Sequence, residues 1–212
     1  MNAPRPAPPP LKRPWYLLVA IVVAWLYGVG GCTEGSAIIG SYWSPSPDVT
    51  DIAARAKTEE ESARVRDAAT RCFVATDQAK NRVFPLGVAS FLLGAATVMF
   101  AARSMAARKG ARPLLVQLVL AQALFVGARD YMTRDLNGAC FDFKVSIAKL
   151  DFESKSHDTS MFDRVSPDMM RTGMWVGFAL RSLVAGLVIL SLTRPRTKEW
   201  YEAMERRRLE GP

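Results

Sequence analysis

One stretch of this sequence, residues 171–193, constrains the fold more than any other. It is RTGMWVGFALRSLVAGLVILSLT, long and apolar enough to cross a bilayer, which needs about 20 mostly apolar residues. Gly173, Gly177 and Arg181 follow one another at four-residue spacing, so they lie on one face of a helix. An arginine facing lipid at this depth is strongly unfavourable. This face is therefore predicted to look into a bundle of helices, where the arginine finds a polar partner.

Three further apolar runs have the same character. They predict membrane spans at residues 15–31, 85–103 and 113–130, and the last of these is short for a span. Four crossings place both ends of the chain on the same side of the membrane. The predicted fold class is an all-α membrane protein, a four-transmembrane-helix bundle with two extracytoplasmic loops at 32–84 and 131–170.

Basic residues are distributed unevenly between the predicted segments. The tails 1–14 and 194–212, the loop 104–112 and Arg103 together carry thirteen basic and four acidic residues. The rest of the chain, apart from Arg181, carries fourteen basic and sixteen acidic residues. By the positive-inside rule both termini are cytoplasmic, and the abundance of Ala, Arg, Gly and Pro favours a bacterial inner membrane. The basic surplus predicts contact with anionic lipids at the cytoplasmic face, and nucleic acid is not expected as a partner.

The three cysteines, Cys32, Cys72 and Cys140, all fall on the predicted outer side. In an oxidising compartment one pair can form a disulfide, and Cys72 with Cys140 is favoured because it would join the two outer loops. Three unpaired thiols are the alternative. The apolar run that ends in VGGC at 29–32 also resembles a lipoprotein signal ending at a lipid-modified cysteine, which would remove residues 1–31. A retained first helix is preferred because it accounts for the charge asymmetry.

Small residues at four-residue spacing allow two helices to approach closely in a membrane. In the first two spans the predicted packing positions are Ala20, Ala24, Gly28, Ser90 and Gly94. Pro85 is predicted at the first turn of the second span, where its missing N–H has no effect. Gly110 and Pro113 predict a tight connection between the second and third spans.

Arg181, Gln122 and Asp130 are the predicted intramembrane polar residues. Arg181 lies roughly 12 Å inside its span at 1.5 Å per residue, and Gln122 lies at a matching depth in the third span. A hydrogen bond between them is predicted, with Asp130 as the nearest carboxylate that could neutralise the arginine. The preferred interpretation is a polar staple that holds the bundle together, and the alternative is an anion contact in a polar cavity.

The two outer loops are predicted to contain structure of their own. Thr58 and Glu61 form a capping box that opens an amphipathic helix in the first loop. In the second loop, apolar and polar residues alternate over 141–147, a period typical of a short strand, which must pair elsewhere because one strand is not stable alone, or else the segment is helical. Ser166 is predicted to cap the last helix. His157, the single histidine, lies in a polar stretch and is predicted to be solvated, with no metal site.

The two tails have different compositions. The N-terminal tail, 1–14, is proline-rich and predicted to be disordered, because proline fixes φ and lacks a backbone donor. The C-terminal tail, 194–212, is basic and amphipathic, with Trp200, Tyr201 and Met204 near one face. It is predicted either to lie flat on the cytoplasmic leaflet or to dock on a partner subunit.

This sequence contains no catalytic or cofactor-binding motif that is specific enough to assign. One histidine cannot form a bis-histidine haem site, and the cysteines form no C-x-x-C pair. We therefore expect a non-catalytic integral membrane protein without cofactor or metal, an accessory or scaffold subunit of a cell-envelope complex. Its expected partners are other membrane subunits or copies of itself. The alternatives are a small transporter or channel-like protein that contacts an anionic solute through Arg181, and, less favoured, a sensor.

Overall fold

The structure is a computed structural model that describes residues 12–43, 48–108, 110–154 and 166–210. Its helices are α1 (Trp15–Trp43), α2 (Val49–Ala53), α3 (Glu59–Met105), α4 (Ala111–Met132), α5 (Arg134–Ala139), α6 (Phe141–Ser154), α7 (Pro167–Thr193) and α8 (Pro195–Glu210). Most of the proline-rich N-terminal tail and His157 lie outside the described residues. Within the described ranges every regular element is a helix and none is a strand, so the predicted all-α fold class holds at this level.

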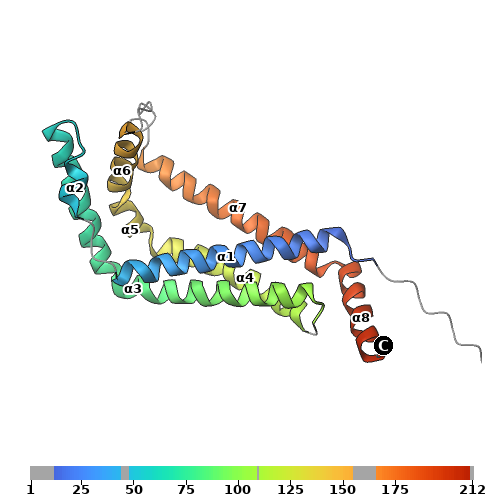
Figure 1. Cartoon of the computed structure of the whole chain (residues 1–212). Helices are drawn as coiled ribbons and strands as arrows, with labels where there is room; N and C mark the ends of the chain where they lie inside the picture. The colour runs from blue at the N-terminus through green and yellow to red at the C-terminus, as the bar shows by residue number, and fades with distance from the viewer. Residues whose placement is uncertain (1–11, 44–47, 109, 155–165, 211–212) are drawn as a thin grey trace, which may run out of the picture.

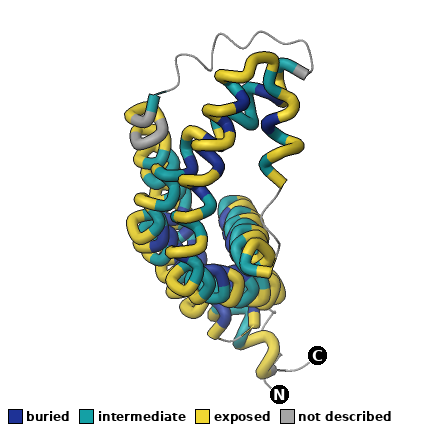
Figure 2. The backbone as a smooth tube through the Cα atoms, turned by 90° about the vertical axis from the view of Figure 1, so that its left-hand side faces the viewer, coloured by how far each residue is buried: buried dark blue, intermediate teal, exposed yellow. Residues whose placement is uncertain are grey.

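Four helices, α1, α3, α4 and α7, are long and apolar enough to cross a membrane. In Figure 1 α1, α4 and the second part of α3 run along nearly the same direction, with α1 and α3 side by side, and α7 is inclined to them. Figure 2 shows buried residues on the inner sides of these helices and exposed residues on the outer sides. The outward side chains are large and apolar, as at Leu92, Leu124 and Leu187, which are 60%, 67% and 56% exposed. Because such surfaces suit hydrocarbon, the four helices indicate a multi-pass membrane protein.

The longest helix, α3, joins two elements that the sequence predicts as separate. It has 47 residues, or about 70 Å of helix, which is more than twice the thickness of a bilayer core. Its start is the predicted capping box, in which the Glu61 N–H donates to Thr58 Oγ1 at 3.2 Å. Pro85 lies inside this helix, so the predicted helix start at that residue is wrong. The helix bends between the part that lies in the cap region and the part that runs beside α1 (Figure 1), and a proline inside a helix allows such a bend because it removes a backbone hydrogen bond.

A small domain that we call the cap is formed by α2, the first half of α3, α5 and α6. The predicted disulfide is confirmed, because Cys72 of α3 is bonded to Cys140 between α5 and α6. Around it lies an apolar core to which Ala53, Val65, Ala68, Ala69, Phe143 and Leu150 belong. The cap therefore has a hydrophobic core of its own beside the bundle (Figure 1).

The alternating segment 141–147 lies in α6, so the predicted strand is wrong. Phe143 and Leu150 are buried in the cap, and Ile147 packs partly against the same core. These three positions are spaced by four and three residues, the spacing of one helix face. Over seven residues the apolar positions fit both periods, and burial of this face against α3 favours the helix.

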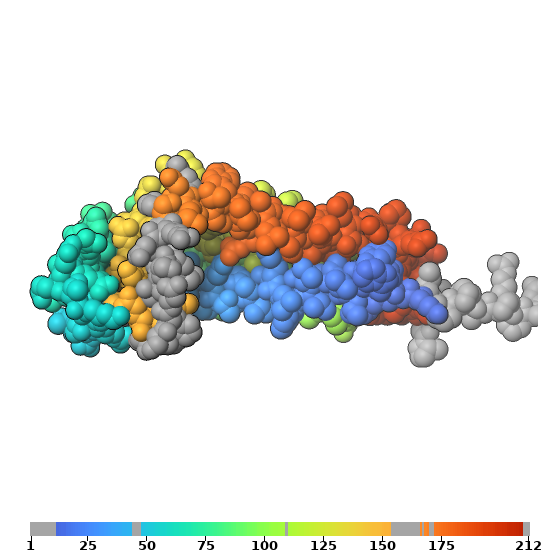
Figure 3. All heavy atoms as spheres, turned by 90° about the horizontal axis from the view of Figure 1, so that it is seen from above, coloured from blue at the N-terminus to red at the C-terminus, as the bar shows by residue number. Residues whose placement is uncertain are grey.

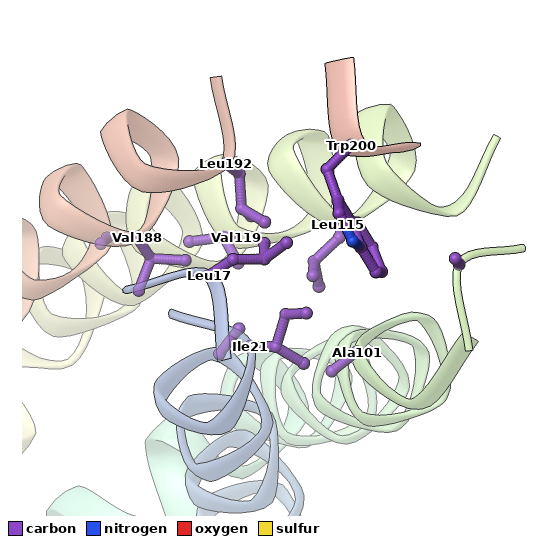
Figure 4. Close-up of a cluster of buried hydrophobic side chains, with 11 residues drawn as sticks. Leu17, Ile21, Ala101, Leu115, Val119, Val188, Leu192 and Trp200 are labelled. Atoms are coloured by element: carbon purple, nitrogen blue, oxygen red, sulfur yellow. The ribbon is translucent and has the colours of Figure 1, made fainter. Parts of the chain in front are cut away.

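A second apolar core holds the other end of the bundle together. Figure 4 shows side chains of α1, α3, α4, α7 and α8 converging on it: Leu17, Ile21, Ala101, Leu115, Val119, Val188, Leu192 and Trp200. Trp200 is only 4% exposed, and Tyr201 Oη donates to the Ser104 carbonyl at 2.8 Å. The aromatic side chains of α8 thus pack on its own bundle, and not on the leaflet or on a partner as predicted for them.

The last spanning helix, α7, touches the bundle most closely in its second half. Ala185, Val188 and Leu192 are buried there. The first half begins near the cap and lies farther from α1 than the second half does (Figure 1), and Figure 3 shows α7 beside α1 when seen from above. The helix start is the predicted one, with the Met169 N–H donating to Ser166 Oγ at 3.3 Å. We call residues 172–180 the cap-side half of α7.

Candidate functional site: a charged network between the spanning helices

The closest approach in the bundle lies between α1 and α3. A Cβ atom on Gly94 would stand 2.6 Å from the Gly28 carbonyl oxygen, a distance that real contacts do not reach. The hydroxyl of Ser90 donates to the Gly31 carbonyl at 3.3 Å. Ala20 and Ala24 are buried, at 4% and 0% exposure. The small residues predicted for the first two spans therefore lie where backbones need room to meet.

Glu34 is the centre of the charged network. It lies in α1, which continues past the end of the apolar run as a regular helix. One carboxylate oxygen accepts from Arg181 Nη2 of α7 at 2.9 Å, and the other accepts from Arg129 Nη1 of α4. A single carboxylate thus bonds two arginines from two other helices, and it ties three spans together.

Asp130 completes the network from α4. It accepts from Nε and Nη2 of its neighbour Arg129, at 3.2 and 2.9 Å. The Arg129 side chain is only 10% exposed, so the desolvation of its charge must be offset by these bonds and by Glu34. Two arginines and two carboxylates form a cluster whose formal charges cancel.

The predicted hydrogen bond between Arg181 and Gln122 is wrong. Gln122 is buried, accepts from the Thr97 hydroxyl at 2.9 Å and donates to the Tyr27 carbonyl at 3.0 Å. Its amide therefore bridges α1, α3 and α4. Arg181 is bonded to Glu34 instead, because α1 does not end at the last apolar residue and carries this carboxylate into the bundle.

Asp130 likewise pairs with Arg129, not with Arg181 as the sequence suggests. Four further residues of this region, Glu34, Arg129, Tyr27 and Thr97, were not among the predicted site residues. One signal for Glu34 was available, since it stands three residues after Gly31 and so lies on nearly the same helix face. The Tyr27 hydroxyl is buried and has no hydrogen-bond partner among the described residues.

Gly173 and Gly177 do not pack inside the bundle. No heavy atom of another element lies within 4 Å of a Cβ placed on either residue. Contact between α4 and α7 occurs nearby, where a Cβ on Gly127 would stand 2.6 Å from the Phe178 ring. The prediction that both glycines face a helix of this chain is therefore corrected, because the cap-side half of α7 diverges from the bundle.

The third cysteine, Cys32, is a free thiol within α1. It is partly buried, and its Sγ lies 3.8 Å from the Phe91 carbonyl oxygen. Lipid modification of Cys32, the alternative to a retained first helix, stays a prediction. Among the described residues no group of three His, Cys, Asp or Glu side chains is arranged to hold a metal ion.

Comparisons with known protein families, curated proteins and solved structures find no match for this chain. The class that the fold defines is a four-span helical membrane protein with a disulfide-linked cap. Its function must be argued from its own geometry.

Proposed function

We propose that this protein is a non-catalytic accessory or scaffold subunit of a membrane complex in the cell envelope. The observation that carries the proposal is the cap-side half of α7, which its own chain leaves largely uncovered. On the side of this segment that carries Gly177, Leu180 is 59% exposed. Gly173 and Gly177 on the same segment leave room for another helix backbone.

The ion pair beside this segment supports the same proposal. The side chains of Arg181 and Glu34 are 43% and 35% exposed, although both lie on spanning helices. A charged pair that faces hydrocarbon is unfavourable, and a helix packed along α7 would cover it and add hydrogen bonds. A neighbouring subunit in the membrane would therefore cover both the open face of α7 and the ion pair beside it.

The location that accompanies the proposal is a bacterial inner membrane with both termini in the cytoplasm. The support is the concentration of basic residues in the tails and in the loop between α3 and α4. The cap, which contains the disulfide, then faces the periplasm, an oxidising compartment.

The proposal is tested by the native mass of the protein and the identity of co-purifying chains after gentle extraction from its own membrane. Gly177→Leu fills the open face of α7 and should release the partner subunit. Gly186→Leu is the matched control. Gly186 also has open space around it, and it lies nine residues further along the same helix, about two and a half turns, so it faces the opposite side. Stoichiometric partners that are lost in the first variant and retained in the second support the proposal. A wild-type protein without partners contradicts it.

A small transporter or channel-like protein is the second candidate. The half-exposed guanidinium of Arg181 favours it, since an anionic solute could reach this group. Against it stands Glu34, which already neutralises the charge. Arg181→Gln separates the two candidates: lost solute flux with intact assembly supports transport, and lost assembly supports the scaffold.

A further inference from the structure

We infer that the end of the bundle opposite the cap binds anionic phospholipid headgroups through a cluster of arginines. We call this surface the basic end, and it consists of Arg13, Arg103, Arg108, Arg206 and Arg208. The inference goes beyond the proposed function, because it requires no partner subunit.

The fold brings Arg13 and Arg208 to the turn between α3 and α4, where Arg103 and Arg108 lie, and Arg206 precedes Arg208 by two residues on α8. Arg208 Nη2 of α8 donates to the Ala106 carbonyl at 3.2 Å, and Arg13 Nη2 donates to the neighbouring Met105 carbonyl. Carbonyls at a helix C-terminus attract cations, so α3 helps to hold both guanidinium groups in place. The buried Trp200 fixes α8 against the bundle, and Arg13 lies 4.7 Å above its ring.

The five arginines of the basic end have no carboxylate partner among the ion pairs of the described residues. All five arginines are exposed. The ion pair seen on α8 joins Lys198 to Glu202 at 3.8 Å. A guanidinium has five N–H donors, and its planar fork matches two phosphate oxygens. The cluster therefore retains donors for a phosphate group.

Neighbouring apolar residues place the basic end at the level of lipid headgroups. Trp15, two residues after Arg13, is 77% exposed at the start of a spanning helix. Met105 and Leu114, at the ends of α3 and α4, are 38% and 42% exposed. Exposed tryptophan and apolar side chains next to arginines are typical of the membrane–water boundary. The phosphates available at this depth belong to phospholipids.

The test measures binding of phosphatidylglycerol and phosphatidylcholine to the full chain in detergent micelles by native mass spectrometry. The variant is Arg108→Gln with Arg206→Gln, chosen because neither side chain makes a hydrogen bond or ion pair among the described residues. Arg66→Gln with Arg82→Gln in the first half of α3 is the control, since both arginines are exposed and the same charge is removed. A basic residue near an anionic surface contributes about fivefold to binding, so the variant should bind phosphatidylglycerol about 25-fold more weakly.

The expected result is a loss of phosphatidylglycerol from the Arg108 and Arg206 variant, with the control unchanged and phosphatidylcholine bound weakly by every protein. Circular dichroism and the elution volume of each variant establish that it is folded. Wild-type affinity in the variant, an equal loss in the control, or equal binding of phosphatidylcholine overturns the inference. Displacement of phosphatidylglycerol by soluble poly-glutamate at physiological salt also overturns it, because the surface would then fit an acidic protein.

Discussion

Replacing Gly94 by alanine should weaken the bundle, although alanine is the better helix former. An added Cβ would stand 2.5 Å from the Cys32 nitrogen and 2.6 Å from the Gly28 oxygen. Ordinary contact begins at 3.4 Å, and both atoms belong to the backbone of α1, so no side chain can move aside. Relief of the closest contact requires α1 and α3 to separate by about 0.9 Å.

The expected magnitude follows from two opposing terms. Overpacking of a close contact costs about 1–3 kcal/mol, and the higher helix propensity of alanine returns about 1 kcal/mol. Gly94→Ala should therefore lower the free energy of unfolding by up to about 2 kcal/mol. Gly30→Ala is the control. A Cβ on Gly30 meets nothing within 4 Å, so this substitution adds only the higher helix propensity of alanine.

The assay is unfolding of both variants and the wild type by SDS titration in mixed micelles, followed by far-UV circular dichroism. The reasoning predicts that Gly94→Ala unfolds at lower SDS than the wild type and that Gly30→Ala does not. If Gly94→Ala is as stable as Gly30→Ala, the close backbone contact between α1 and α3 is not a feature of the folded protein.

Three further predictions concern the network, the cap and α8. Glu34→Gln removes one carboxylate bonded to two arginines and should lower the free energy of unfolding by about 2 kcal/mol, which is less than the loss for a fully buried ion pair. SDS titration measures this loss, and a variant as stable as the wild type would contradict the prediction. Cys72→Ser removes the disulfide between residues 68 apart in the sequence, and the loop-closure relation gives a destabilisation of the cap of about 4 kcal/mol. Lower resistance of the cap to protease measures this effect. Burial raises the pKa of Tyr201 above 10.0, outweighing the lowering effects of its bond to Ser104 and of nearby arginines. The stability from this tyrosine is therefore complete below pH 10 and lost as pH rises through its folded pKa, whereas Tyr201→Phe should lack this alkaline step.

Features of the fold that depend on local chemistry could be predicted from the sequence. The caps at Thr58 and Ser166 need only a hydroxyl before a helix, and both are formed. The spans could be predicted because about 20 apolar residues suffice to mark one. The pairing of Cys72 with Cys140 followed from an assignment of loops to one side of the membrane.

Features that depend on how long helices continue, and where they lean, could not be predicted. Glu34 was assigned to a loop because a charge ends an apolar run, yet α1 continues as a helix to Trp43 and holds Glu34 between α4 and α7. Pro85 was taken as a helix start, although a bent helix also tolerates proline. The open surroundings of Gly173 and Gly177 accompany the inclination of α7 to the bundle, a tertiary feature that the four-residue spacing of small residues does not specify.

Photo-crosslinking from α7 in native membranes tests the central claim most directly. A benzophenone amino acid at position 177 points from the cap-side half of α7, and the same group at position 186 reports on the other side of the helix. The account predicts one discrete protein adduct from position 177, absent from position 186, with a chain that mass spectrometry identifies as a stoichiometric partner. Lipid adducts alone at both positions, from a protein that purifies as a monomer, would contradict the claim that this chain is a subunit.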